Sequence, residues 1–168
     1  MVNVPILASL LLVGRKFSYF HRMKAMQWLV PGLILPLLAG CSSFHREWRE
    51  AMKQPATAHD ITGCWEGTWQ NSNNTHQDRM WAILTRTSDT EYRAHFHARY
   101  KKLFSFSYRT TFRGSWIGEE FRFHGEEDLG ALAGGLYNYE GRASPTNFFS
   151  TYSSKYDVGT FILHRRPE

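Results

Sequence analysis

Alternation of apolar and polar side chains is the feature that most limits how this chain can fold. In residues 92–100, aromatic residues and alanines alternate with arginines and histidines. Residues 104–112 repeat the pattern with aromatic residues between serine, arginine and threonine. A period of two places one kind of side chain on each face of a β-strand, so both segments predict strands with one buried face.

Further short aromatic and apolar runs, separated by Gly, Asn, Asp and Ser, extend this pattern over residues 61–166. About eight strands joined by short turns predict an antiparallel meander. Closing the meander removes its exposed edges, so we predict an all-β domain, a small antiparallel barrel of about eight strands. A two-sheet β-sandwich is the alternative. Residues 126–135 combine helical leucine spacing with glycines, which predicts an irregular loop over one mouth of the barrel.

The segment before this domain has the pattern of a secretion signal. Residues 26–40 are mostly apolar, follow Lys24 and fall short of the roughly 20 residues that a membrane span needs. The sequence Leu38-Ala39-Gly40-Cys41 resembles the lipobox of bacterial lipoproteins, in which a peptidase cuts before an acylated cysteine. The resemblance implies that residues 23–40 are a signal peptide and that lipidated Cys41 attaches the protein to a membrane. The alternatives are a coincidental cysteine after an ordinary signal and a short membrane helix.

The residues on either side of this signal complete the expected organisation. Residues 1–22 hold a second apolar run, which lipoprotein signals seldom have, so we expect translation to start at Met23 and residues 1–22 to be no part of the protein. A long basic leader is the alternative. Ser42 resembles the residue of outer-membrane lipoproteins, which implies a cell-envelope protein anchored in the outer membrane and facing the periplasm or the cell surface.

Residues 41–60 are predicted to form a short helix and a linker after the lipidated cysteine. Phe44, Trp48 and Met52 share one helical stripe, and Pro55 ends the helix. We expect this helix to dock on the domain or to act as a tether. A position on the bilayer surface is the alternative.

The charge balance excludes one class of partner. The chain has 20 Lys and Arg against 15 Asp and Glu, but four of the bases precede residue 41, which leaves 16 bases against 15 acids. Nucleic-acid binding needs clustered bases in the folded part, so we predict no nucleic-acid partner.

Few residues suggest enzyme chemistry. His95 and His97 share one strand face, but the alternation directs them to solvent, and catalytic zinc needs three shielded ligands. The consecutive acids at residues 126–128 are typical of a solvated loop, and Cys64 is predicted to be a buried thiol. Motifs for a serine nucleophile, a phosphate loop or a zinc protease do not occur. We therefore predict a non-catalytic protein without metal or cofactor.

Aromatic side chains are the candidates for a binding function. They could pack the barrel interior completely, or line an apolar cavity in which tyrosine hydroxyls are polar contacts. Ala94 and Ala98 leave space beside Phe96, which favours a cavity. The candidate pocket or core residues are Trp65, Trp69, Trp81, Phe96, Phe104, Phe106, Tyr108, Phe121 and Phe123.

A short motif suggests what such a barrel does. Gly63-Cys64-Trp65 resembles the Gly-x-Trp motif of lipocalins and, more loosely, the opening of avidin-type barrels; both groups are calycins. The resemblance implies a calycin-like barrel closed by Trp65, with Arg165 or Arg166 against its ring. It also implies binding of a small apolar or amphipathic envelope molecule. Residues 137–161 resemble uncharacterised lipoproteins of environmental bacteria. A structural or partner-binding envelope module with a solid core is the alternative.

Overall fold

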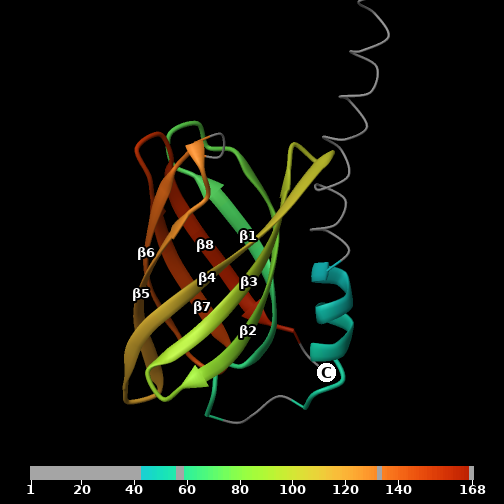
Figure 1. Cartoon of the computed structure of the whole chain (residues 1–168), viewed down its shortest axis with the longest axis vertical. Helices are drawn as coiled ribbons and strands as arrows, with labels where there is room; N and C mark the ends of the chain where they lie inside the picture. Colours follow the sequence, from blue (N-terminus) through green and yellow to red (C-terminus); the bar gives the residue numbers. More distant parts are fainter. Residues whose placement is uncertain (1–42, 56–58, 132–133, 167–168) are drawn as a thin grey trace, which may run out of the picture. The chain divides into compact units, whose positions relative to one another are not determined.

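The structure is a computed structural model that describes residues 43–55, 59–131 and 134–166 (Figure 1). These residues form a helix at 43–51 and an eight-stranded, closed antiparallel barrel. The predicted all-β barrel is confirmed, and the sandwich alternative is excluded because the last strand pairs with the first. The predicted signal peptide, the lipidation site Cys41 and the upstream segment 1–22 lie outside the described residues.

The strands follow one another round the barrel in chain order. Each pairs antiparallel with the next, so odd-numbered strands run toward one end of the barrel and even-numbered strands return from it. The strands are β1 (Gly63–Asn71), β2 (Gln77–Ser88), β3 (Glu91–Tyr100), β4 (Phe104–Ile117), β5 (Glu120–Asp128), β6 (Leu136–Ala143), β7 (Asn147–Ser153) and β8 (Val158–Arg165).

The alternation in β3 shows how this sequence fills a narrow barrel. Tyr92, Ala94, Phe96 and Ala98 all point inward and are buried. The alanines leave room for large neighbours, and Phe96 packs against Tyr108 of β4 with ring centroids 5.3 Å apart. Burying each large side chain contributes about 1.5–3 kcal/mol.

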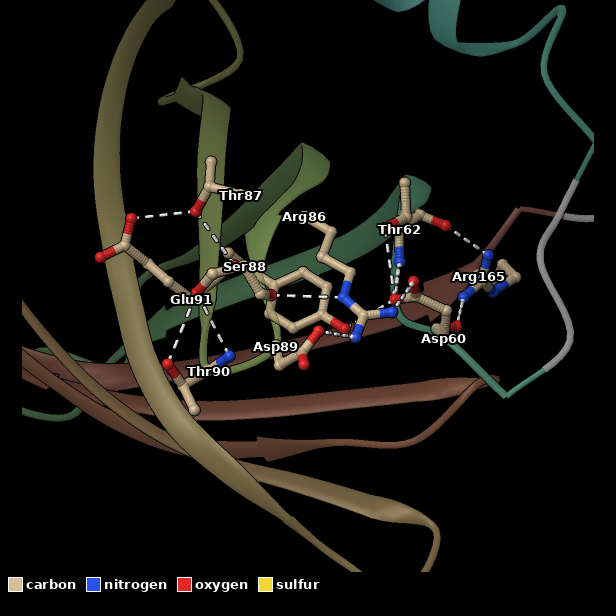
Figure 2. A network of polar contacts seen from close by, with 10 residues as sticks. Asp60, Thr62, Arg86, Thr87, Ser88, Asp89, Thr90, Glu91 and Arg165 are labelled. Atoms are coloured by element: carbon tan, nitrogen blue, oxygen red, sulfur yellow. Dashed lines mark hydrogen bonds and ion pairs between the residues drawn. The ribbon is translucent and has the colours of Figure 1, made fainter.

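One end of the barrel is closed by Trp65 and Arg165, which are paired across β1 and β8. The guanidinium of Arg165 lies 5.0 Å from the Trp65 ring centroid. It also donates hydrogen bonds to the carbonyl oxygens of Thr62 (2.6 Å) and Asp60, as Figure 2 shows, and to that of Pro145 (2.5 Å). The last strand therefore supplies the expected cation over Trp65, and Arg165 is the residue that does so.

A buried carboxylate completes the closed end. The Oδ1 atom of Asp60 accepts hydrogen bonds from the Tyr92 hydroxyl (2.8 Å) and the backbone N–H of Thr62 (3.1 Å). Arg86 lies 3.6 Å from Oδ2 and also donates to Asp89 (Figure 2). Burial and the Asp60 carboxylate raise the pKa of Tyr92 to about 12. The closed end is thus sealed by a polar network around Asp60.

The helix at 43–51 docks on the outer face of β3. Docking on the domain is one of the two arrangements expected from the sequence. Phe44 is buried and stacks on His97, with centroids 4.9 Å apart. The Glu47 carboxylate lies 2.6 Å from His95 Nδ1 and 2.5 Å from Arg109 Nη2. No helix in the described part of the chain has the length and apolarity needed to cross a membrane.

The predicted solvent exposure of the two histidines is wrong. His95 and His97 are only 4% and 6% exposed, because the docked helix covers the outward face of β3. Burial lowers the pKa of His95, even though Glu47 opposes the shift, and burial likewise lowers the pKa of His97. Both rings therefore belong to the packing between helix and barrel.

Candidate ligand-binding cavity

The barrel is hollow at the end opposite Trp65. A cavity of about 620 Å³ opens there, within the range of about 300–1,000 Å³ typical of small-molecule sites. Its walls are mainly aromatic. They consist of Trp69, Met80, Ala98, Tyr100, Phe106, Ser107, Tyr108, Leu129, Tyr137, Tyr139, Tyr152, Asp157 and Phe161.

The hairpin topology brings these residues together. Odd strands end at the open end and even strands begin there, so the late part of one strand lies beside the early part of the next. Trp69 and Ala98 come from the ends of β1 and β3, whereas Met80 and Tyr139 come from the early parts of β2 and β6. The inward face of each strand then directs its side chain into the cavity.

Four tyrosines form the most distinctive wall. Tyr108 stacks on Tyr139, which stacks on Tyr137, with ring centroids 6.4 Å apart in both pairs. Tyr137 lies 6.1 Å from Tyr152. Burial raises the pKa of all four hydroxyls, so they remain neutral hydrogen-bond donors at physiological pH.

The hydroxyl of Tyr139 is the unusual polar group of this wall. It is buried and forms no hydrogen bond of good geometry within the described residues, where its polar neighbour is the hydroxyl of Tyr108. An unsatisfied buried hydroxyl costs about 1–3 kcal/mol, so such groups normally have a partner. A molecule in the cavity that carries an acceptor atom would offer a better partner than the Tyr108 hydroxyl.

Asp157 is the carboxylate among the lining residues. It accepts hydrogen bonds from the Asn71 side chain (2.5 Å) and the Tyr152 hydroxyl (3.5 Å). Burial raises the pKa of Asp157. Its negative charge disfavours an anionic ligand group nearby, whereas a neutral or cationic group is compatible with it.

A second wall is built around Trp69. Its indole N–H donates to the carbonyl oxygen of Arg99 at 2.9 Å, and its ring stacks on Tyr100 with centroids 6.2 Å apart. These contacts hold the indole in one orientation. Trp69 is therefore an internal fluorescent reporter of the cavity.

The loop predicted at residues 126–135 is shorter than expected. Strand β5 continues to Asp128, so the acids at 126–128 belong to a strand and not to a loop. The connection begins at Leu129, and its side chain lines the cavity. Of the described loop residues, Leu129 is the one that lines the barrel mouth.

Seven of the nine candidate aromatic residues lie in the interior or along the cavity. Trp69, Phe106 and Tyr108 line the cavity. Phe96 lies among the buried core side chains, as do Trp65, Phe121 and Phe123. The interior therefore combines the two alternatives, with a packed closed end and a hollow open end.

The structure places the other two candidates, Trp81 and Phe104, outside the barrel interior. Trp81 lies between inward-facing Met80 and Ala82, so the pleat turns it outward, where Arg79 covers its ring at 4.8 Å. Phe104 is 66% exposed because it begins β4 at the hairpin tip.

Several cavity residues were not predicted, most importantly Tyr137, Tyr139 and Tyr152. A signal for them exists in the sequence. In a meander, the late residues of odd strands and the early residues of even strands meet at one end, and these tyrosines occupy such positions.

The described residues show no arrangement of three His, Cys, Asp or Glu that could hold a metal. Cys64 is a buried free thiol, and burial raises its pKa to about 11. Since the thiolate is the reactive form, Cys64 is poorly suited to nucleophilic chemistry.

Comparison with known proteins adds the following. No protein-family model matches this sequence, and no curated protein matches it. Among solved structures, the chain is similar to a de novo designed fluorescence-activating β-barrel, with 18% identity and a TM-score of 0.47. The match covers 68% of this chain and 100% of the designed one.

Proposed function

We propose that the open end of the barrel binds a small amphipathic molecule without transforming it. The observation that supports this most directly is the aromatic cavity of about 620 Å³ with the buried Tyr139 hydroxyl in its wall. Apolar walls favour a hydrocarbon or ring system, and the hydroxyl favours one acceptor atom on that body. Asp157 makes a neutral head group more suitable than an anionic one.

The experiment is a fluorescence titration of the full chain with N-phenyl-1-naphthylamine, followed by displacement with 1-dodecanol. We expect saturable binding and a change in tryptophan emission, because Trp69 lines the cavity. Ala98→Phe should abolish both by filling the cavity, and Thr151→Phe, which adds the same ring to an exposed position of β7, should not. Equal binding by the two variants would refute the proposal and favour the alternative of a structural module.

A second variant tests the polar contact. Tyr139→Phe removes only the hydroxyl, so affinity for the apolar naphthylamine should stay the same. Affinity for dodecanol should fall about 5-fold to 10-fold, as expected for one hydrogen bond of about 1–1.5 kcal/mol. An unchanged ratio of the two affinities would show that this hydroxyl makes no contact with the ligand.

We further propose that the protein is a lipoprotein of a bacterial cell envelope, attached to the membrane through acylated Cys41. The support is the lipobox-like Leu38-Ala39-Gly40-Cys41 after an apolar segment. Cells that express the chain should incorporate labelled palmitate, and Cys41→Ser should prevent it. Cys64→Ser, the matched control, should leave the label in place.

A further inference from the structure

We propose that the tip of the β3–β4 hairpin docks on a phospholipid bilayer with anionic head groups. This would turn the mouth of the cavity toward the membrane. The residues of this surface support the proposal independently of ligand binding. The proposal also extends the proposed function, because it identifies the bilayer as the source of the ligand.

The first observation is an exposed apolar tip. Leu103 is 85% exposed and Phe104 66%, and the aromatic side chains of Tyr100 and Phe106 beside them are also exposed. Figure 1 shows this hairpin, in yellow, extending at one end of the barrel. Grouped exposed apolar side chains at one point of a surface mark interaction sites, and aromatic residues are favoured at membrane interfaces.

The second observation is the distribution of positive charge. All three lysines of the barrel lie in turns at the open end. Lys101 and Lys102 are in the β3–β4 turn, and Lys155 is in the β7–β8 turn beside the exposed ring of Tyr156. Lysine side chains can reach lipid phosphates while their apolar neighbours enter the membrane. This combination fits an anionic bilayer.

Several acids lie at the same end, but they are set back from the tip or already paired. Glu126 pairs with Thr111 of β4, seven residues from Phe104 along the strand, so the acids at the end of β5 lie away from the tip. Asp78 accepts hydrogen bonds from Arg99 and from the backbone N–H of Lys102. Asp128 accepts from the N–H of its own loop, and Asp157 accepts from Asn71. The turns of the closed end carry Asp89 and Glu119 and no lysine. The arginines beside those turns are in ion pairs, as Arg86 is with Asp89 and Arg142 with Glu120.

The third observation is the backbone of the turn. Lys101 and Lys102 have φ angles of 51° and 63°, and the N–H of Leu103 donates to the carbonyl oxygen of Tyr100 at 3.3 Å. Two consecutive positive φ angles in a hairpin turn favour Asn and Gly, because other side chains are strained there. Turn geometry therefore does not explain the lysines, whereas contact with anionic head groups does.

The hairpin is continuous with the cavity. Tyr100 and Phe106, which flank the tip, also line the cavity wall. A bilayer that contacts Leu103 and Phe104 would therefore lie next to the opening. An amphipathic ligand could then pass between membrane and cavity with little exposure to water.

The test is hydrogen–deuterium exchange of the full chain. It is measured alone, with phosphatidylcholine vesicles, and with vesicles containing 30 mol% phosphatidylglycerol. We expect the anionic vesicles to slow exchange at residues 99–107 and 154–158, and to leave the closed-end turns at 88–91 and 117–120 unchanged. This local readout is independent of any attachment through the N-terminal segment.

Two pairs of variants separate charge from apolar contact. A lysine near an anionic surface changes affinity about 5-fold, so Lys101→Gln with Lys102→Gln should remove most of the protection. Arg93→Gln with Arg122→Gln is the matched change at exposed positions near the closed-end starts of β3 and β5. Leu103→Asp should also abolish protection, and Ile117→Asp, at an exposed apolar position of the closed end, should not.

The outcomes are distinct from those of the cavity experiment, which contains no vesicles. Absence of protection on both vesicle types overturns the proposal and leaves a protein partner as the occupant of the tip. Equal protection on neutral vesicles overturns the assignment to an anionic surface. Equal protection of the closed-end turns overturns the docking orientation.

Discussion

Asp78 is predicted to stabilise the open end through its negative charge. It is buried, and its Oδ1 atom lies 2.6 Å from Arg99 Nε. The backbone N–H groups of Arg79 and Lys102 also donate to it, at 2.8 and 3.0 Å. The carboxylate thus ties the β3–β4 turn to β2, and Asp78→Asn keeps its shape while removing its charge.

The size of the effect follows from the pKa of this group. Burial alone would raise the pKa of Asp78, but the hydrogen bonds from Arg99 and the two N–H groups outweigh burial and lower it from 3.8 to about 2. A lowered pKa in the folded state means that the stabilisation is present above pH 3.8 and is lost as the pH falls toward 2. The difference amounts to about 2 kcal/mol at pH 7 and about 1 kcal/mol at pH 3.

The assay is urea unfolding of the wild type and Asp78→Asn between pH 7 and pH 3. The difference between the two free energies of unfolding reports on Asp78 alone, because all other carboxylates titrate in both proteins and cancel. Asp89→Asn is the control, because Asp89 is exposed and surface ion pairs contribute about 0–1 kcal/mol. A gap that does not shrink with falling pH, or an equal gap for Asp89→Asn, would refute the reasoning.

Three further predictions concern the rest of the fold. Arg165→Met should lower the free energy of unfolding in urea by about 2–4 kcal/mol, because it leaves carbonyl groups unpaired. Arg166→Met, at an exposed position, is the control and should change this free energy little. Gly114→Ala should lower the melting temperature in a thermal scan, because its Cβ would overlap the backbone of β5 where β4 and β5 approach closely. Burial lowers the pKa of His97 from 6.5, so docking of the helix is favoured above pH 6.5. Amide exchange at residues 43–51, corrected for intrinsic rates, should therefore rise as the pH falls. His97→Phe should reduce that pH dependence, and an unchanged profile would contradict this role of the ring.

The barrel could be predicted from the sequence because side-chain alternation and short turns are local properties. The side chains that cover each strand face could not be predicted in this way. Alternation predicts solvent exposure for His95 and His97 because it separates the two faces of β3, but it does not reveal that Phe44 and Glu47 cover the outer face. Phe104 has the alternation of a core residue, yet the strand extends past the barrel wall at that point and leaves it exposed.

The contrast between the packed and hollow ends follows from which aromatic residue stands at each level of the barrel. Five tyrosines but two phenylalanines line the open end, whereas Phe112, Phe121, Phe123 and Phe148 belong to the packed core beyond it. A phenylalanine ring has no polar atom and can be enclosed on all sides, but each tyrosine hydroxyl needs a partner. Tyr92 meets this requirement at the closed end through Asp60, whereas Tyr139 at the open end has only an imperfect contact with the Tyr108 hydroxyl. The tyrosines therefore give the open end a surface that a polar or amphipathic molecule would complete, a preference that a purely apolar core of the same size would lack.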